Sequence, residues 1–195
     1  YTVTLKPNLK WHDGQPLTVD DVIFTYKTIQ NPDAKSPLLA SWTGIKIEKV
    51  DEKTVRFSLP VAYSPFPHSL TTGIIPQHIL GKSTAPQLRS ASFNTKNPIG
   101  SGPFKWVTVQ KTTSSNNNES TTVQLTKYDA FHRGKPNLDG FTIQTYNENE
   151  ELKSALASKE VVTASGLSLK KTEIDNGYTT TDYNLMTANM LFMNN

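Results

Sequence analysis

The sequence of 195 residues contains no cysteine. This removes any risk of wrong disulfides in an oxidising compartment, but many cytosolic proteins also lack cysteine, so the location stays open. No apolar run approaches the roughly 18 residues of a membrane-spanning helix. The 20 Lys and Arg residues stand against 17 Asp and Glu, for a net charge of +3, and they are scattered. Nucleic-acid binding needs a clustered basic face, so no nucleic-acid partner is predicted.

The sequence also lacks a recognisable catalytic or metal-binding pattern. None of its four histidines has the short spacing of a zinc site. Ser101 stands between Gly100 and Gly102 but precedes a strand pattern, whereas a nucleophile elbow places its serine between a strand and a helix. We therefore predict no catalytic residue, no metal site and no cofactor. The histidines are His12, His68, His78 and His132.

The first thirty residues carry the clearest local signals. Residues 1–6 alternate apolar and polar side chains, as a half-buried strand does, and Asp13-Gly14 is a strong turn dipeptide. Thr18 occupies the position of an N-cap, and Asp20-Asp21 follows where carboxylates complement the helix dipole. The apolar periodicity then predicts a helix over residues 19–30.

The remainder of the chain predicts short strands and helices without the regular spacing of a doubly wound sheet. A hairpin is expected at residues 44–50 and 54–59, with Ile45, Ile47 and Val50 facing inward. The polar segment 112–122 is expected to be a loop between two strands. The other expected elements are helices at 77–80, 148–157 and 167–176, and strands at 104–107, 123–127, 141–146, 161–164 and within 178–195.

Five motifs, in order along the chain, resemble one family. The first is Lys10-Trp11-His12-Asp13-Gly14, followed by Pro16-Leu17-Thr18 and the helix. The others are residues 50–57, residues 73–80 with Ile75-Pro76-Gln77-His78, Asn97-Pro98-Ile99-Gly100-Ser101-Gly102-Pro103-Phe104-Lys105, and Arg133-Gly134-Lys135-Pro136 within residues 131–139. Together they span most of the chain and resemble the family 5 extracellular solute-binding proteins, the peptide- and nickel-type receptors of bacterial ABC importers.

The resemblance implies a mixed α/β (α+β) chain that forms part of a periplasmic-binding-protein type II-like fold. Residues 1–76 would be the β-rich subdomain, and residues 77–195 part of lobe one. Both ends of the chain lie in strand patterns, so we expect a fragment from which the second lobe and the opening segment of lobe one are absent.

The resemblance also implies a function. The protein would capture peptides or other small solutes outside the membrane, as a monomer, and deliver them to the permease subunits of the importer. It would be extracytoplasmic and lipid-anchored in its full-length form. Dipeptide, oligopeptide, nickel chelate and sugar all remain open as ligands. A receptor fold that serves as a surface adhesion or protein-interaction module is the alternative function, and an enzyme would need an activated nucleophile that the sequence does not place.

The predicted ligand-binding residues are Ala164, Ser165, Gly166 and Leu167, which match the family segment that lines the cleft. Small side chains there would allow the backbone of an extended ligand to approach closely. An ordinary connecting loop is the alternative. Just before this segment the chain reads Lys159-Glu160-Val161-Val162, where the family usually has Gly-Glu-Ile/Val-Asp.

Overall fold

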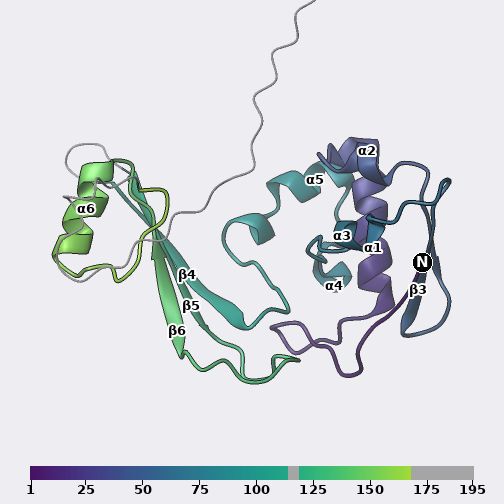
Figure 1. Cartoon of the computed structure of the whole chain (residues 1–195), viewed down its shortest axis with the longest axis horizontal. Helices are drawn as coiled ribbons and strands as arrows, with labels where there is room; N and C mark the ends of the chain where they lie inside the picture. Colours follow the sequence, from purple (N-terminus) through teal and green to yellow (C-terminus); the bar gives the residue numbers. More distant parts are fainter. Residues whose placement is uncertain (114–118, 168–195) are drawn as a thin grey trace, which may run out of the picture. The chain divides into compact units, whose positions relative to one another are not determined.

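The computed structural model describes residues 1–113 and 119–167 (Figure 1). The chain divides into two compact units, Tyr1–Thr145 and Tyr146–Asn195. The predicted division after residue 76 lies inside the first unit and stays a prediction. The elements are β1 (Thr2–Thr4), α1 (Val19–Gln30), the 3₁₀ helix η1 (Pro32–Ala34), α2 (Leu39–Trp42), β2 (Lys46–Lys49), β3 (Thr54–Ser58), α3 (Phe66–Ser69), α4 (Gln77–Leu80), α5 (Ala85–Ser90), η2 (Ser92–Asn94), β4 (Phe104–Thr113), β5 (Glu119–Lys127), β6 (Gly140–Gln144) and α6 (Asn149–Ala157).

Helix α1 has the predicted bounds and the predicted cap. Thr18 is extended backbone at the N-cap, and its amide donates to the Asp21 carboxylate over 2.8 Å. This reciprocal cap satisfies an amide that the helix itself leaves without a partner. The helix ends at Gln30, with Asn31 as its C-cap, because the following proline cannot donate a hydrogen bond to continue it.

The first sheet has the antiparallel order β1-β3-β2, and α1 packs against it. The aromatic rings of this core are in direct contact: Tyr26 stacks on Trp42 with centroids 4.0 Å apart, and Phe57 meets Tyr26 edge-on at 5.4 Å. Full burial of each large apolar side chain contributes on the order of 1.5–3 kcal/mol. The buried cluster comprises Val19, Val22, Tyr26, Ile29, Trp42, Ile45, Val55, Phe57 and Phe66.

The hairpin prediction is confirmed, but the inward direction predicted for Val50 is wrong. Ile45 is buried and Ile47 packs against the core, whereas Val50 is 45% exposed. The last strand pair is Lys49↔Val55, and the Val50 amide already belongs to the turn, where it donates to the carbonyl of Thr54. Strand alternation places Ile45, Ile47 and Lys49 on one face, so Val50, an odd number of residues after Ile47, lies on the opposite face, away from the core.

The second sheet has the antiparallel order β4-β5-β6. Its β4–β5 register shifts between Trp106 and Thr108, so Val107 forms a bulge and is exposed. The predicted polar loop at 112–122 is too long, because Thr112 pairs with Ser120 and Thr113 with Glu119. Threonine favours the pleated sheet despite its polarity, so composition alone misplaced the strand ends.

In the second unit, α6 confirms the predicted helix at 148–157 within one residue. The strand predicted at 161–164 is absent, since those residues are irregular. Lys159 there adopts a φ of 60°, and the Glu160 amide donates back to the carbonyl of Ala155, which turns the chain out of the helix. The predicted helix at 167–176, apart from the irregular Leu167, and the predicted strands within 178–195 lie outside the described residues.

Candidate functional site

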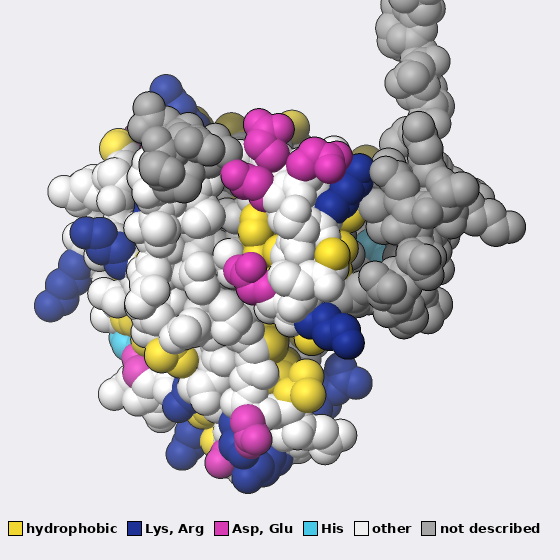
Figure 2. Space-filling model, turned by 90° about the vertical axis from the view of Figure 1, so that its left-hand side faces the viewer, with side chains coloured by type: hydrophobic (Ala, Val, Ile, Leu, Met, Phe, Trp, Pro, Cys, Tyr) yellow, Lys and Arg dark blue, Asp and Glu magenta, His cyan; other side chains and the backbone are white. Residues whose placement is uncertain are grey.

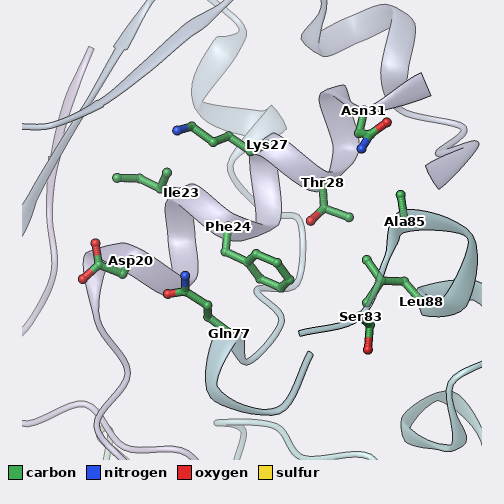
Figure 3. Close-up of a pocket in the computed structure, with 10 residues that line it drawn as sticks. All are labelled: Asp20, Ile23, Phe24, Lys27, Thr28, Asn31, Gln77, Ser83, Ala85 and Leu88. Atoms are coloured by element: carbon green, nitrogen blue, oxygen red, sulfur yellow. The ribbon is translucent and has the colours of Figure 1, made fainter. Parts of the chain in front are cut away.

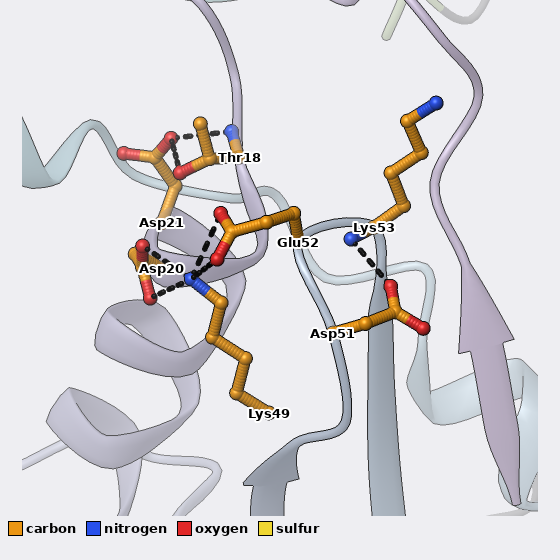
Figure 4. Close-up of polar contacts among 7 residues, drawn as sticks. All are labelled: Thr18, Asp20, Asp21, Lys49, Asp51, Glu52 and Lys53. Carbon is orange, nitrogen blue, oxygen red and sulfur yellow. Dashed lines mark hydrogen bonds and ion pairs between the residues drawn. The ribbon is translucent and has the colours of Figure 1, made fainter.

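A buried carboxylate, Asp21, joins three segments of the first unit. Only 4% of the residue is exposed. Its carboxylate accepts hydrogen bonds from the indole of Trp11 (3.3 Å), the amide of Thr18 (2.8 Å) and the amide of Gln77 (2.8 Å). Figure 4 shows the first turn of α1 with Thr18 beside Asp21. Asp21 therefore fixes the segment 11–14, here called the N-terminal turn, and the start of α4 to the start of α1.

The sequence predicted only part of this role. Asp20 and Asp21 were both interpreted as dipole partners of the helix, yet their surroundings differ completely. Asp20 is exposed and pairs with Lys49 over 3.1 Å, and Lys49 also pairs with Glu52. These two carboxylates raise the pKa of Lys49. In Figure 4 the Lys49 ammonium lies between Asp20 and Glu52, whereas Asp21 faces Thr18. Such exposed pairs contribute little to stability. The buried Asp21 carboxylate has four donors, including the Thr18 hydroxyl at 3.3 Å, and is costly to remove.

A second junction links His12 to the loop Gly100-Ser101-Gly102, about ninety residues away in the sequence. The Gly100 amide donates to Nδ1 of His12 (3.2 Å), and Nε2 lies 3.0 Å from the carbonyl of Gly102. The His12 amide also donates to the carbonyl of Gly100 over 2.8 Å. The two motifs that the sequence treated as separate turns are thus in contact.

Tyr128, at the end of β5, completes this junction. Its buried hydroxyl donates to the carbonyl of Trp11 over 3.0 Å, and its ring meets His12 edge-on with centroids 5.0 Å apart. Desolvation by burial lowers the pKa of His12, and Lys105 adds to that effect, although the bond to the Gly102 carbonyl opposes it. His12 is therefore held neutral more strongly than a free histidine.

His78 and Asp13 form a partly exposed pair beside the same turn, with Nε2 and Oδ2 2.7 Å apart. Burial alone would raise the pKa of Asp13, but the hydrogen bonds from His78 and from the Gln15 amide outweigh it and hold the pKa below its usual value. The pair secures the turn to α4. In the part of the chain that the structure describes, no cluster of three His, Cys, Asp or Glu side chains is placed to hold a metal ion.

One pocket of about 330 Å³ lies between α1 and the segment from α4 to α5 (Figure 3). Ile23, Phe24 and Leu88 give it apolar walls, and Asp20 and Lys27 lie on exposed turns of α1. This volume is at the lower end of the range for small-molecule pockets. The remaining lining residues are Thr28, Asn31, Gln77, Ser83 and Ala85.

The predicted ligand-binding residues lie in the irregular segment after α6. Ala164, Ser165 and Gly166 are exposed, Leu167 is half-buried, and Gly166 has a φ of +78°. They are consecutive in the sequence. In the same unit, α6 carries Glu150 and Glu151 in its first turn, and Figure 2 shows acidic side chains gathered on the face that carries α6.

Among residues 1–113 and 119–167, no helix combines the length and the apolar character needed to cross a bilayer. The acid and base side chains found in close contact there, such as Asp13 with His78, are explained by structural hydrogen bonds. What the described geometry offers to a small molecule is the pocket between α1 and the segment from α4 to α5.

Known proteins similar to this chain share both its sequence and its fold. The oligopeptide-binding protein AppA of Bacillus subtilis is 34% identical over 145 residues, covering 73% of this chain and 25% of AppA. The structure of AppA in complex with a nonapeptide superimposes with a TM-score of 0.72 at 31% identity, covering 83% of this chain and 31% of AppA.

Two further solved structures extend the comparison. The ABC transporter substrate-binding protein CtaP of Listeria monocytogenes has a TM-score of 0.71 at 36% identity, covering 83% of this chain and 32% of CtaP. NikZ of Campylobacter jejuni, in complex with Ni(L-His), has a TM-score of 0.71 at 26% identity, covering 83% of this chain and 30% of NikZ. The chain thus spans about a quarter to a third of the length of these relatives.

These likenesses confirm the predicted fold class, a mixed chain that forms part of a periplasmic-binding-protein type II fold. The sequence model described as "Bacterial extracellular solute-binding proteins, family 5 Middle" matches residues 1–195. The chain therefore belongs to the family 5 bacterial extracellular solute-binding proteins.

Proposed function

We propose that this chain is part of the substrate-binding component of an ABC importer, which captures peptides outside the membrane and delivers them to the permease. The observation that carries the proposal is the family match over the full length of the chain. The relatives support a peptide as the ligand, since AppA is named for oligopeptides and was solved with a nonapeptide. Capture in these folds needs no chemistry at the ligand, only a cleft that closes by a hinge motion.

The same proposal covers the localisation of the protein, its domain division and its partners. It acts as an extracytoplasmic, lipid-anchored monomer, with residues 1–76 as the β-rich subdomain and residues 77–195 as part of lobe one. Permease subunits are its membrane partners, and nucleic acid is not a partner. A surface adhesion module is not favoured, because the relatives reported above are named or solved as solute-binding proteins.

Residues 164–167 contribute to the ligand site in this proposal. Three of the four are exposed, and their side chains are small. Gly166 has the positive φ that only glycine adopts without strain, so the backbone there is open to a hydrogen-bonded extended ligand. A nickel chelate is the second ligand class to test, because NikZ was solved in complex with Ni(L-His).

Calorimetry on the full-length protein that contains this segment tests the proposal. Peptides of two to nine residues are titrated into the protein, and Ni(L-His) and an oligosaccharide are titrated separately as comparison ligands. We expect a peptide to bind with the lowest dissociation constant, and binding of none of the peptides would refute the proposal. Residues 1–195 alone are expected to bind di- to pentapeptides weakly or not at all.

A glycine substitution tests the ligand segment separately. Gly166→Ala should weaken peptide binding by about tenfold, which corresponds to about 1.4 kcal/mol. Gly134→Ala is the matched control, since Gly134 also has a positive φ, of 102°, and a Cβ there would likewise meet no atom within 4 Å. Equal affinities of the two variants would remove residues 164–167 from the site while leaving the receptor function intact.

A further inference from the structure

The bonds around His12 allow only one form of its ring. The Gly100 amide can only donate, so Nδ1 must accept and carry no proton. The Gly102 carbonyl can only accept, so Nε2 must carry the proton that lies between them at 3.0 Å. The ring is therefore neutral and in the Nε2–H tautomer, and both of its nitrogens bind the same loop, Gly100-Ser101-Gly102.

A second proton on this ring has no acceptor at the Gly100 side. Protonated Nδ1 would direct an N–H toward the N–H of Gly100 across 3.2 Å, so that hydrogen bond would be replaced by a repulsion. The Nε2–H bond to Gly102 and the backbone bond from His12 to Gly100 would remain. Protonation therefore breaks one specific contact and leaves its neighbours in place.

The charged and titratable groups around the ring oppose this proton more than they favour it. Lys105, from β4, places its ammonium 5.6 Å from the centroid of the Tyr128 ring, which itself contacts His12, and its charge disfavours a second cation. Asp13, the next residue, favours the cation, but its carboxylate is already bonded to His78. The Tyr128 hydroxyl is neutral and is used by the Trp11 carbonyl.

We propose that His12 is a pH-sensitive latch, whose neutral ring fastens the loop Gly100-Ser101-Gly102 to the N-terminal turn and whose protonation releases the Gly100 amide. The latch fixes the segment that leads into β4, because Pro103 follows the loop directly and β4 begins at Phe104. Release is local: the Tyr128 amide still donates to the carbonyl of Pro103, and Trp11 still donates to Asp21. The inference is independent of the proposed function.

Nuclear magnetic resonance on the chain itself tests the latch directly. The ¹⁵N signals of the His12 ring should report the Nε2–H tautomer at pH 7 and a protonation midpoint below 6.5, the value of an unperturbed histidine. Through that midpoint the hydrogen-exchange protection factor of the Gly100 amide should fall by about tenfold, the effect of losing one hydrogen bond. The amides of Gly14 and Tyr128, which donate to backbone carbonyls, should keep their protection factors.

Two substitutions separate the acceptor from the titration. In His12→Asn the side-chain oxygen, like Nδ1, is one bond from Cγ, so it can accept from Gly100 at any pH. In His12→Gln the amide lies one atom further out and mimics Nε2 instead. We expect Asn to keep Gly100 protected at both pH 7 and pH 5, and Gln to leave it unprotected at both.

Glycine variants test the same contact from the loop side without altering the histidine. A Cβ on Gly100 would lie 3.3 Å from Cε1 of His12, whereas a Cβ on Gly102 would meet no atom within 4 Å. Gly100→Ala should therefore raise the His12 midpoint toward 6.5, and Gly102→Ala should not. A midpoint at or above 6.5 in the unaltered chain, or Gly100 protection that does not change through the midpoint, would overturn the proposal. His132→Gln is the control for other histidines.

Discussion

The two sheets of the first unit differ in how completely their apolar side chains are buried. The first sheet is covered by α1, and its aromatic cluster of Tyr26, Trp42 and Phe57 is almost completely buried. The second sheet also has an apolar face, but Phe141 and Ile143 on β6 remain 40% and 47% exposed. On β5, Leu125 pairs with Phe141 and Val123 pairs with Ile143, so these side chains lie on the same apolar face of the sheet.

This difference shows where the stability of the described chain resides. The body formed by residues 1–80, here called the N-terminal body, buries a core of its own, and hydrophobic burial is the dominant favourable term in folding. The second sheet depends more on its hydrogen-bonded ladders and on its junctions with the N-terminal body, where the Gly100 amide donates to His12 and the Tyr128 hydroxyl donates to the carbonyl of Trp11. Substitutions in the two regions should therefore lower the free energy of unfolding by different amounts, and the loss should be larger where the substituted side chain is more buried.

The largest expected effect comes from removing a core aromatic. Trp42→Ala should lower the free energy of unfolding by about 3–5 kcal/mol, because it leaves a cavity beside Tyr26. Phe141→Ala in the second sheet should cost about 1 kcal/mol, chiefly its edge-on contact with Phe104 at 4.8 Å. Urea denaturation measures both. Equal costs would contradict the contrast between the sheets.

The buried carboxylate should give the next largest effect. Asp21→Ala leaves the donors of Trp11, Thr18 and Gln77 without their acceptor, so it should cost about 2–4 kcal/mol. Asp20→Ala, one residue earlier, loses only an exposed pair with Lys49 and should cost less than about 1 kcal/mol. Thermal unfolding of the two variants side by side tests the assignment, which fails if Asp20 matters as much as Asp21.

A substitution at Gly140 tests whether the second sheet can be destabilised without affecting the N-terminal body. A Cβ on Gly140 would lie 2.3 Å from the carbonyl oxygen of Leu125, so the β5–β6 ladder must shift. Gly140→Ala should cost about 1–3 kcal/mol. Hydrogen exchange should show the loss in the amides of β6 and not in α1. Gly73→Ala, where a Cβ would meet nothing within 4 Å, is the control in the N-terminal body.

The smallest expected effect is the contribution of the Asp13–His78 pair to the stability of the protein at acid pH. The pKa of Asp13 is held below 3.8 when folded, so its stabilisation is present above that value and is lost as the pH falls through the lower folded pKa. His78→Gln should therefore make the fall in stability from pH 5 to pH 3 slightly shallower. His68→Gln should leave the slope unchanged. A steeper fall in His78→Gln would reverse the sign of the argument.

Local rules were sufficient for much of the fold. Thr18 and the apolar spacing after it predicted α1 within its observed bounds, and the hairpin followed from alternation. The same rules placed the short helix α4 at residues 77–80, but they missed α2, α3 and α5, which are four to six residues long and too short for a reliable periodic signal. They also ended the long strands of the second sheet too early, because polar threonines pair there as well as apolar residues do.

The sequence by itself identified the family through the resemblance of its five motifs. It also determined the helix α1 and the turn at Asp13-Gly14, because caps, turns and periodicity act between residues close in the chain. Only the tertiary structure decided that Asp21 is buried and that His12 meets Gly100 and Gly102. Those contacts join residues up to ninety positions apart, and their strength comes from burial and from exact hydrogen-bond partners. Neither property is written in the spacing of a single sequence.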